Sequence, residues 1–212
     1  MSVKIVVDSA SEFSYEEAKA LGLYFCPLSV SFGDTEYRDS IDIDNKTFYE
    51  MLEASKDLPK TSQVGPFAFQ EAFEEIVENG HTALAITLSS KLSGTYSSAR
   101  LAAQSFPGKV FLVDSLSATI GEKILVLYAL ELTKTIDDPE EIVKRLEEKR
   151  EKIGICYLLD TLEYLHKGGR LSAAQALAGS ILSLKPLCTL TNGEVEVIAK
   201  ARGVKKGMEK LA

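Results

Sequence analysis

Residues 82–98, TALAITLSSKLSGTYSS, begin as a largely apolar run and end as a hydroxyl-rich turn that leads into a helix. An apolar run of this length, bounded by polar residues, is typical of a parallel strand that is buried on both faces. The turn brings Ser93 and Gly94 to the start of a helix predicted over 93–106. The stretch therefore predicts one strand-and-helix unit of a parallel α/β sheet.

The chain on either side repeats this alternation of buried strands and amphipathic helices. Further strands are predicted over 3–7, 23–32 and 109–113, and helices over 44–55, 66–79, 117–134 and 139–150. This order predicts an α/β fold, with a doubly wound, mostly parallel sheet over residues 1–151. Ligands of such folds bind at the carboxyl ends of the strands. Three polar pairs are expected there, namely Asp8-Ser9, Ser89-Ser90 and Asp114-Ser115.

The pattern changes in the last sixty residues. A strand over 153–159 and an apolar helix over 171–184 precede two strands that meet at Asn192-Gly193. Asn-Gly between alternating apolar residues is the strongest short signal for a β-hairpin. Residues 152–212 are therefore expected to form a second, smaller α/β domain, which looks truncated because it has few elements for a complete sheet.

The charge, the lengths of the apolar runs and the cysteines of the chain indicate which partners and which location to expect. The 212 residues carry a formal net charge of −7 and no long basic run, which argues against nucleic acid as the main partner. No apolar run approaches the roughly 18 residues of a membrane span, and no signal peptide is recognised at the start. Cys26, Cys156 and Cys188 each sit in an apolar run, so buried free thiols are expected. A cytoplasmic location is predicted.

Two hydroxyl-bearing segments precede predicted helices. Thr61 and Ser62 come shortly before the helix that begins near Pro66, and Ser93 and Gly94 come at the start of the next one. The hydroxyls can simply cap these helices. They can also donate to a ligand oxygen at a helix N-terminus, where Gly94 would let a ligand approach the backbone. Both interpretations remain open from the residues alone.

Two arginines have a similar pair of interpretations. Arg170 follows a Gly-Gly turn, which fits either a helix C-cap or a cation held in place for a carboxylate. Arg202 lies among Lys200, Lys205 and Lys206. This basic group fits either a solvated strand end or a surface that attracts an acidic partner or a membrane.

The usual catalytic motifs are missing. The sequence has no nucleophile elbow, no Walker A loop and no dinucleotide-binding glycine pattern, and neither His81 nor His166 has metal-ligand spacing. No catalytic residue, metal site or cofactor is therefore predicted. The alternative is an enzyme that uses the Ser93 loop, either a hydrolase or a sugar-kinase-like protein with Asp8 and Asp114 at a magnesium ion.

Six motifs in one order cover nearly the whole chain and resemble the DegV family. They are Val7-Asp8-Ser9, Thr61-Ser62-Gln63, the run from Leu88 to Tyr96, Asp114-Ser115, the run from Tyr164 to Arg170, and Lys185-Pro186. Single motifs of this length are weak signals, whereas their combination and order are specific.

The resemblance implies two α/β domains that hold a long-chain fatty acid between them, with no other cofactor. It implies that Thr61 and Ser93 hold the carboxylate, with Ser62, Gly94 and Arg170 around it, and that Arg202 faces a partner. That partner would be a fatty acid kinase subunit, which phosphorylates the bound carboxylate to an acyl phosphate. The protein itself is then a monomeric binding subunit and not an enzyme. Members of the family usually continue beyond the hairpin with further strands and helices.

Overall fold

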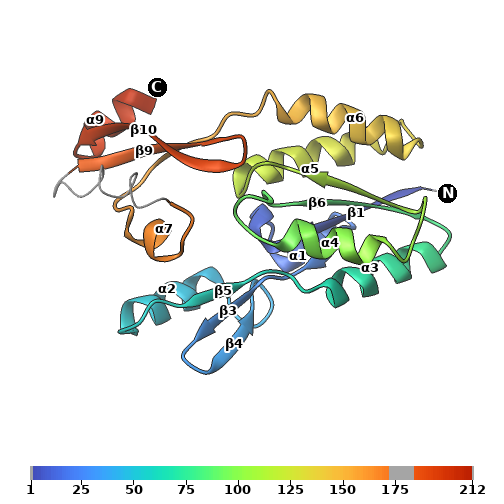
Figure 1. Ribbon diagram of the computed structural model, residues 1–212, viewed down its shortest axis with the longest axis horizontal. Helices are drawn as coiled ribbons and strands as arrows, with labels where there is room; N and C mark the ends of the chain where they lie inside the picture. The colour runs from blue at the N-terminus through green and yellow to red at the C-terminus, as the bar shows by residue number, and fades with distance from the viewer. Residues whose placement is uncertain (1, 172–183, 212) are drawn as a thin grey trace. The chain divides into compact units, whose positions relative to one another are not determined.

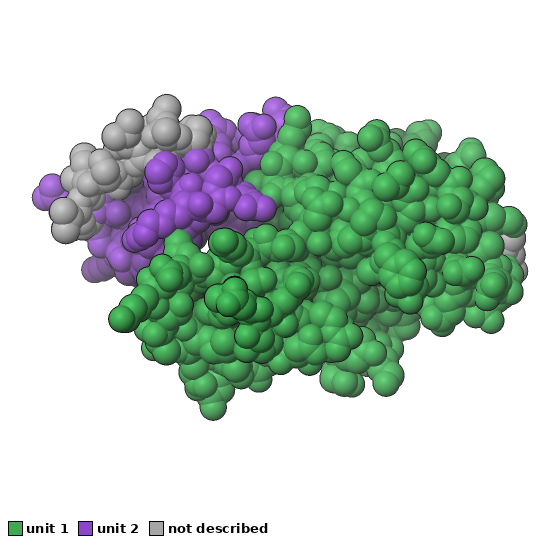
Figure 2. All heavy atoms as spheres, turned by 60° about the horizontal axis from the view of Figure 1, so that its bottom comes forward, with its two compact units in different colours: residues 1–152 green, residues 153–212 purple. Residues whose placement is uncertain are grey.

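The computed structural model describes residues 2–171 and 184–211. The chain divides into two compact units, Met1–Lys152 and Ile153–Ala212, which Figure 2 colours separately. The predicted helix over 171–184 lies outside the described residues, apart from its two ends.

The first unit is built on a parallel sheet of four strands (Figure 1). In spatial order these are β2 (Tyr24–Cys26), β1 (Val3–Asp8), β6 (Thr82–Thr87) and β7 (Val110–Asp114). All neighbouring strands run parallel, so the predicted α/β architecture is confirmed. From the central pair the chain winds outward in opposite directions, to β2 on one side and to β7 on the other. The switch point of the topology therefore lies between β1 and β6, where α/β folds bind ligands.

Helices cover both faces of this sheet (Figure 1). One face carries α3 (Pro66–Glu78) and α4 (Thr95–Ala103), and the other carries α5 (Ile120–Leu132) and α6 (Pro139–Arg150). The remaining helices of the unit are η1 (Ser9–Ser11), α1 (Tyr15–Ala20) and α2 (Asn45–Ala54). The predicted helix start at Asp44 is confirmed, because its carboxylate accepts a hydrogen bond from Thr47 N at 2.7 Å.

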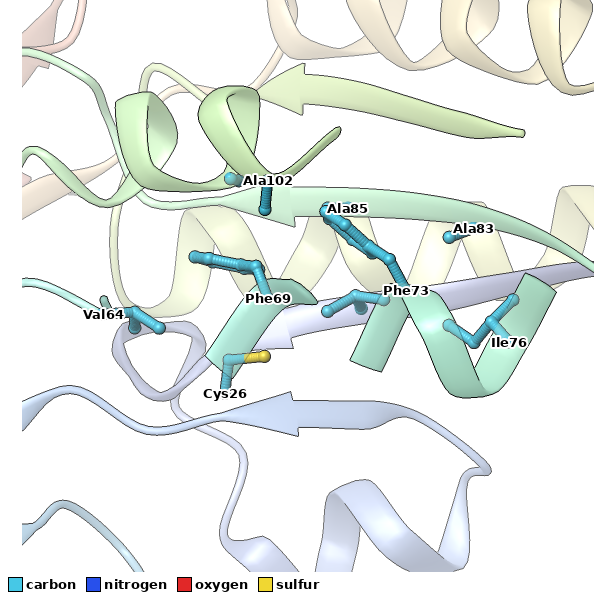
Figure 3. Packing of buried hydrophobic residues seen from close by; sticks show 10 residues of the cluster. Cys26, Val64, Phe69, Phe73, Ile76, Ala83, Ala85 and Ala102 are labelled. Carbon is cyan, nitrogen blue, oxygen red and sulfur yellow. The ribbon is translucent and has the colours of Figure 1, made fainter. Parts of the chain in front are cut away.

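The core between α3 and the sheet fixes β6 in place (Figure 3). Phe69, Phe73 and Ile76 are fully buried at helical spacing, and they pack with Ala83 and Ala85 of β6. The small alanines leave room for the two rings, whose centroids are 5.9 Å apart. Each buried phenylalanine contributes about 1.5–3 kcal/mol. The loop after β6 therefore extends from a rigid strand.

The prediction of one strand over 23–32 was wrong. Its second half is β3 (Ser29–Phe32), which pairs with β4 (Thr35–Arg38) and β5 (Lys60–Ser62) in a separate antiparallel sheet. The break falls at Pro27, which has no amide hydrogen to continue a sheet. The next amide, that of Leu28, donates instead to Ser9 Oγ at 3.1 Å.

The second unit holds an antiparallel sheet of three strands. These are β10 (Glu194–Arg202), β9 (Leu184–Thr191) and β8 (Cys156–Leu158), accompanied by α7 (Glu163–Lys167) and α9 (Val204–Leu211). The hairpin predicted at Asn192-Gly193 is present, and both residues have positive φ, at 51° and 84°. This is the backbone that a two-residue hairpin turn requires.

The prediction that Cys156 is buried was also wrong. It was expected to be buried, but it is exposed, whereas Cys26 and Cys188 are buried. The reason is its place in the sheet, because β8 is an edge strand.

Along the described ranges, no helix is both long enough and apolar enough to cross a membrane.

Candidate carboxylate-binding site

Asp8 joins the two central strands at the switch point of the first unit. Its Oδ2 accepts a hydrogen bond from Leu88 N at 2.8 Å, and its Oδ1 accepts one from Ala10 N at 2.9 Å. The side chain is fully buried. Burial raises the pKa of this carboxyl from 3.8 to about 7, although the two amide donors oppose the rise. Asp8 thus holds the first residue of the loop that leads to Ser93.

The rest of that loop is also held through its backbone. Ser89 N donates to Ser117 O at 2.7 Å, and Ser90 N donates to Asp114 Oδ1 at 3.1 Å. Ser93 N closes the turn by donating to Ser89 O at 3.1 Å. The loop is therefore tied to the carboxyl ends of both neighbouring strands, which gives Ser93 a defined position.

The segment that follows Thr61 contacts the start of α4. Gln63 Nε2 donates to Ser98 Oγ at 2.8 Å, and Val64 N donates to Thr95 Oγ1 at 3.3 Å. Residues 35 and 31 positions apart in the sequence are thereby brought together. Thr61 stands two residues from this contact.

Gly94 is needed for the same contact. A Cβ at this position would overlap the carboxamide of Gln63, whose Oε1 lies closest. Its backbone is ordinary, with φ at −75°, so the constraint is space and not conformation. In the structure the space beside Gly94 is occupied by Gln63, and the close approach of a ligand to the Gly94 backbone stays a prediction.

Thr61 and Ser62 are not helix caps. They belong to β5, and the N-cap of α3 is Gly65, which makes no side-chain capping bond. Both side chains are exposed. Their hydroxyls are therefore accessible to a ligand.

Ser93 is not the N-cap of α4 either, because Gly94 occupies that position. Its Oγ accepts from Thr95 N at 3.2 Å and lies 2.9 Å from Thr95 Oγ1. Within the described part of the chain, the amides of Tyr96 and Ser97 in the first helical turn have no acceptor. Such amides, with the helix dipole, favour an anion at this end of the helix.

The two predicted arginines belong to the second unit. Arg170 closes the C-terminus of α7, where its N donates to Leu165 O at 2.9 Å and Gly169 adopts a positive φ of 74°. Its Nη1 also donates to Gly168 O at 2.5 Å. The Gly-Gly turn is thus a helix C-cap. Arg202 ends β10 and is exposed.

The side chains that the enzyme alternative would need for a general base or a magnesium ion make other contacts in the structure. His81 precedes β6, at the opposite end of that strand from Ser93, and its Nδ1 lies 3.0 Å from Ser2 Oγ. Asp114 Oδ1 accepts from Ser90 N and from Leu116 N. Over the described ranges, no group of three or more His, Cys, Asp or Glu side chains is arranged to hold a metal ion.

Gln63 and Thr95, which join the two segments, and a buried glutamate of α5 were not among the predicted site residues. Gln63 and Thr95 look like ordinary polar residues, because their partners lie on distant segments. Glu122 is fully buried, and neither carboxylate oxygen has a partner among the described residues. Burial raises its pKa well above the usual value, and the charges of Asp8 and Asp114 add to the rise. A signal was available, because Glu122 stands within the apolar stripe of α5.

The fold and the site define a two-unit α/β protein with a cluster of hydroxyl and amide donors at a sheet switch point. A family model described as an uncharacterised protein of the DegV family matches residues 2–212. A DegV domain-containing protein from Deinococcus radiodurans is 37% identical over 212 residues, which are 100% of this chain and 75% of the relative. The chain belongs to the DegV family.

Solved structures agree with this assignment. One is the structure of a fatty acid-binding DegV family protein from Thermus thermophilus, which is 37% identical to this chain and superposes with a TM-score of 0.90. The match covers 99% of this chain and 75% of that one. Another is a stearic acid-binding protein from Eubacterium ventriosum, which is 28% identical to this chain and has a TM-score of 0.87. That match covers 96% of this chain and 72% of the other.

Proposed function

We propose that this protein binds one long-chain fatty acid and holds its carboxylate with the hydroxyls of Thr61 and Ser93. The observation that carries the proposal is the contact of Gln63 with Ser98 and Gly94, which brings the strand of Thr61 to the N-terminus of α4. Fatty acid binding in the related structures supports it.

The chemistry of the donor cluster suits a carboxylate. Hydroxyl and amide donors stabilise a single negative charge, and the helix dipole adds to this. Ser62, Gly94 and Arg170 are proposed to complete the surroundings of the head group. Most of the affinity would come from the acyl chain, since about fifteen buried methylenes contribute roughly 12 kcal/mol before the costs of association.

Ser93→Ala is expected to weaken fatty acid binding by about tenfold to a hundredfold without abolishing it. A hydrogen bond to a charged group contributes about 1.5–3 kcal/mol, while the helix amides and the burial of the acyl chain remain. The affinity of the delipidated variant for a fatty acid can be measured by calorimetry, with stoichiometry from native mass spectrometry. One ligand per chain is expected for the wild-type protein.

Ser97→Ala is the matched control, because it removes an exposed hydroxyl from the same helical turn. It should leave the affinity within about twofold. If Ser93→Ala lowers the melting temperature but leaves the affinity unchanged, Ser93 has only a local structural role. A wild-type protein that binds no fatty acid would contradict the proposed function itself.

We further propose that the protein is a binding subunit, which presents the carboxylate to a separate fatty acid kinase subunit. It would act as a cytoplasmic monomer with transient contact to a membrane surface. The proposed site supports this role, because it supplies donors for the head group while the Asp8 and Asp114 carboxylates hold loop amides. With ATP and magnesium the isolated protein should show no turnover.

Arg202→Ala is expected to lower kinase-dependent phosphorylation by about tenfold while fatty acid affinity stays within about twofold. Arg202 is exposed at the end of β10, close in sequence to exposed Lys205 and Lys206 of α9. Charges at the rim of an interface act mainly on the rate of association with a partner of opposite charge. The measurement is acyl phosphate formation at several kinase concentrations.

Arg145→Ala, which removes an exposed arginine of α6, controls for the loss of one positive charge. Equal phosphorylation rates for Arg202→Ala and the wild-type protein would remove Arg202 from the partner surface.

A further inference from the structure

The hydroxyl groups of Ser93 and Thr95 form a pair in which only one group is accessible. Their oxygens are 2.9 Å apart, and either could be the donor. Thr95 is fully buried, whereas Ser93 is partly exposed. The direction of the hydrogen bond between them decides what Ser93 can offer to a ligand.

The buried member of the pair has few choices. Thr95 Oγ1 accepts a hydrogen bond from Val64 N at 3.3 Å. Among the described residues, Ser93 Oγ is the one acceptor within reach of the Thr95 hydroxyl proton. If Ser93 donated to Thr95, the proton of Thr95 would be buried without an acceptor, which is unfavourable. Thr95 therefore donates to Ser93.

The consequence for Ser93 follows from its own contacts. Its Oγ already accepts from Thr95 N at 3.2 Å, and it now accepts from the Thr95 hydroxyl as well. A hydroxyl has one proton and two acceptor positions. Both acceptor positions are filled, so the proton of Ser93 points away from the pair. A hydroxyl that accepts in this way is also a stronger donor.

We propose that Thr95 is a positioning residue, which turns Ser93 into a donor only and thereby selects a ligand whose head group accepts hydrogen bonds. This inference rests on the proposed function and adds a basis for its specificity. A carboxylate can only accept. A fatty alcohol can accept or donate, so its binding does not depend on the direction of the Ser93 hydroxyl.

The test is the variant Thr95→Val, which keeps the shape of the side chain and removes the hydroxyl. Affinity for a fatty acid is expected to fall about fivefold. This corresponds to about 1 kcal/mol, the net contribution of one hydrogen bond whose direction is no longer fixed. Affinity for the fatty alcohol of the same chain length should change less than twofold. Thr95→Ser, which keeps the hydroxyl, should restore the preference for the acid.

A double-mutant cycle separates this role from a general loss of structure. In the Ser93→Ala background, Thr95→Val should lower fatty acid affinity by less than in the wild-type protein, because only the bond from Val64 N to Thr95 Oγ1 is then left to lose. Equal losses for acid and alcohol, or additive losses in the cycle, would overturn the proposal. If Thr95→Val does not fold, Thr95→Cys replaces it, since a thiol is a weak donor of similar size.

The outcomes also keep the two proposals apart. If the wild-type protein binds neither acid nor alcohol, the proposed function fails. If it binds the acid and the cycle is additive, fatty acid binding stands and only the role of Thr95 is lost.

Discussion

Raising the pH from about 4 to about 7 is expected to remove up to about 4 kcal/mol of stability through Asp8 alone. The buried carboxyl has a pKa of about 7 in the folded protein, against 3.8 ordinarily. Between these two values the folded state holds a proton that the unfolded state releases, so the free energy of unfolding falls as the pH rises. The magnitude is an upper bound from 1.36 kcal/mol per pH unit.

Comparison with Asp8→Asn isolates this contribution, because the other carboxyl groups are present in both proteins. The amide cannot accept from both Leu88 N and Ala10 N, so the variant should be less stable at pH 4 by about 1–3 kcal/mol. That deficit should shrink or reverse by pH 7. Urea unfolding at a series of pH values measures the difference.

Asp34→Asn, at an exposed position between β3 and β4, is the control and should leave the pH dependence of the wild-type protein unchanged. A constant difference between Asp8→Asn and the wild-type protein over pH 4–7 would mean that Asp8 is ionised throughout. The same experiment reports on the site, because Asp8 holds the start of the Ser93 loop through Leu88 N.

Gly94→Ala is expected to weaken fatty acid binding by about a hundredfold or more. The new Cβ would overlap the carboxamide of Gln63, so this side chain must leave and give up its bond to Ser98. Of the two hydrogen bonds between the Thr61 segment and α4, only that from Val64 N to Thr95 Oγ1 then remains, so the hydroxyls of Thr61 and Ser93 are expected no longer to converge on the head group. Two hydrogen bonds to a charged group together contribute about 3–6 kcal/mol. A hundredfold loss of affinity corresponds to about 2.8 kcal/mol, close to the lower end of this range.

Gln63→Ala supplies the decisive comparison. It empties the space that the new methyl group needs, so Gly94→Ala should do little additional harm in a Gln63→Ala background. Gly65→Ala is the matched control, since a Cβ there meets nothing within 4 Å and φ is −72°. Strictly additive losses in affinity for Gly94→Ala and Gln63→Ala would show that the two residues act independently.

The sequence alone determined the architecture and predicted the region of the site. The apolar run 82–88 is typical of a buried strand, and the alternation of such runs with amphipathic helices around it predicts the parallel sheet. The hairpin at Asn192-Gly193 followed from turn chemistry that needs positive φ at both positions. The family resemblance selected Thr61 and Ser93 among many hydroxyl groups.

Only the tertiary structure decided what the neighbouring side chains do. Gln63, Thr95 and Gly94 lie on segments about 30 residues apart, and no local pattern shows that a carboxamide will fill the space above a glycine. The buried state of Asp8 and Glu122 also depends on packing from several elements at once. Hydrogen-bond direction and pKa are set by the surroundings of a group in space, and these surroundings exist only when the distant segments have come together.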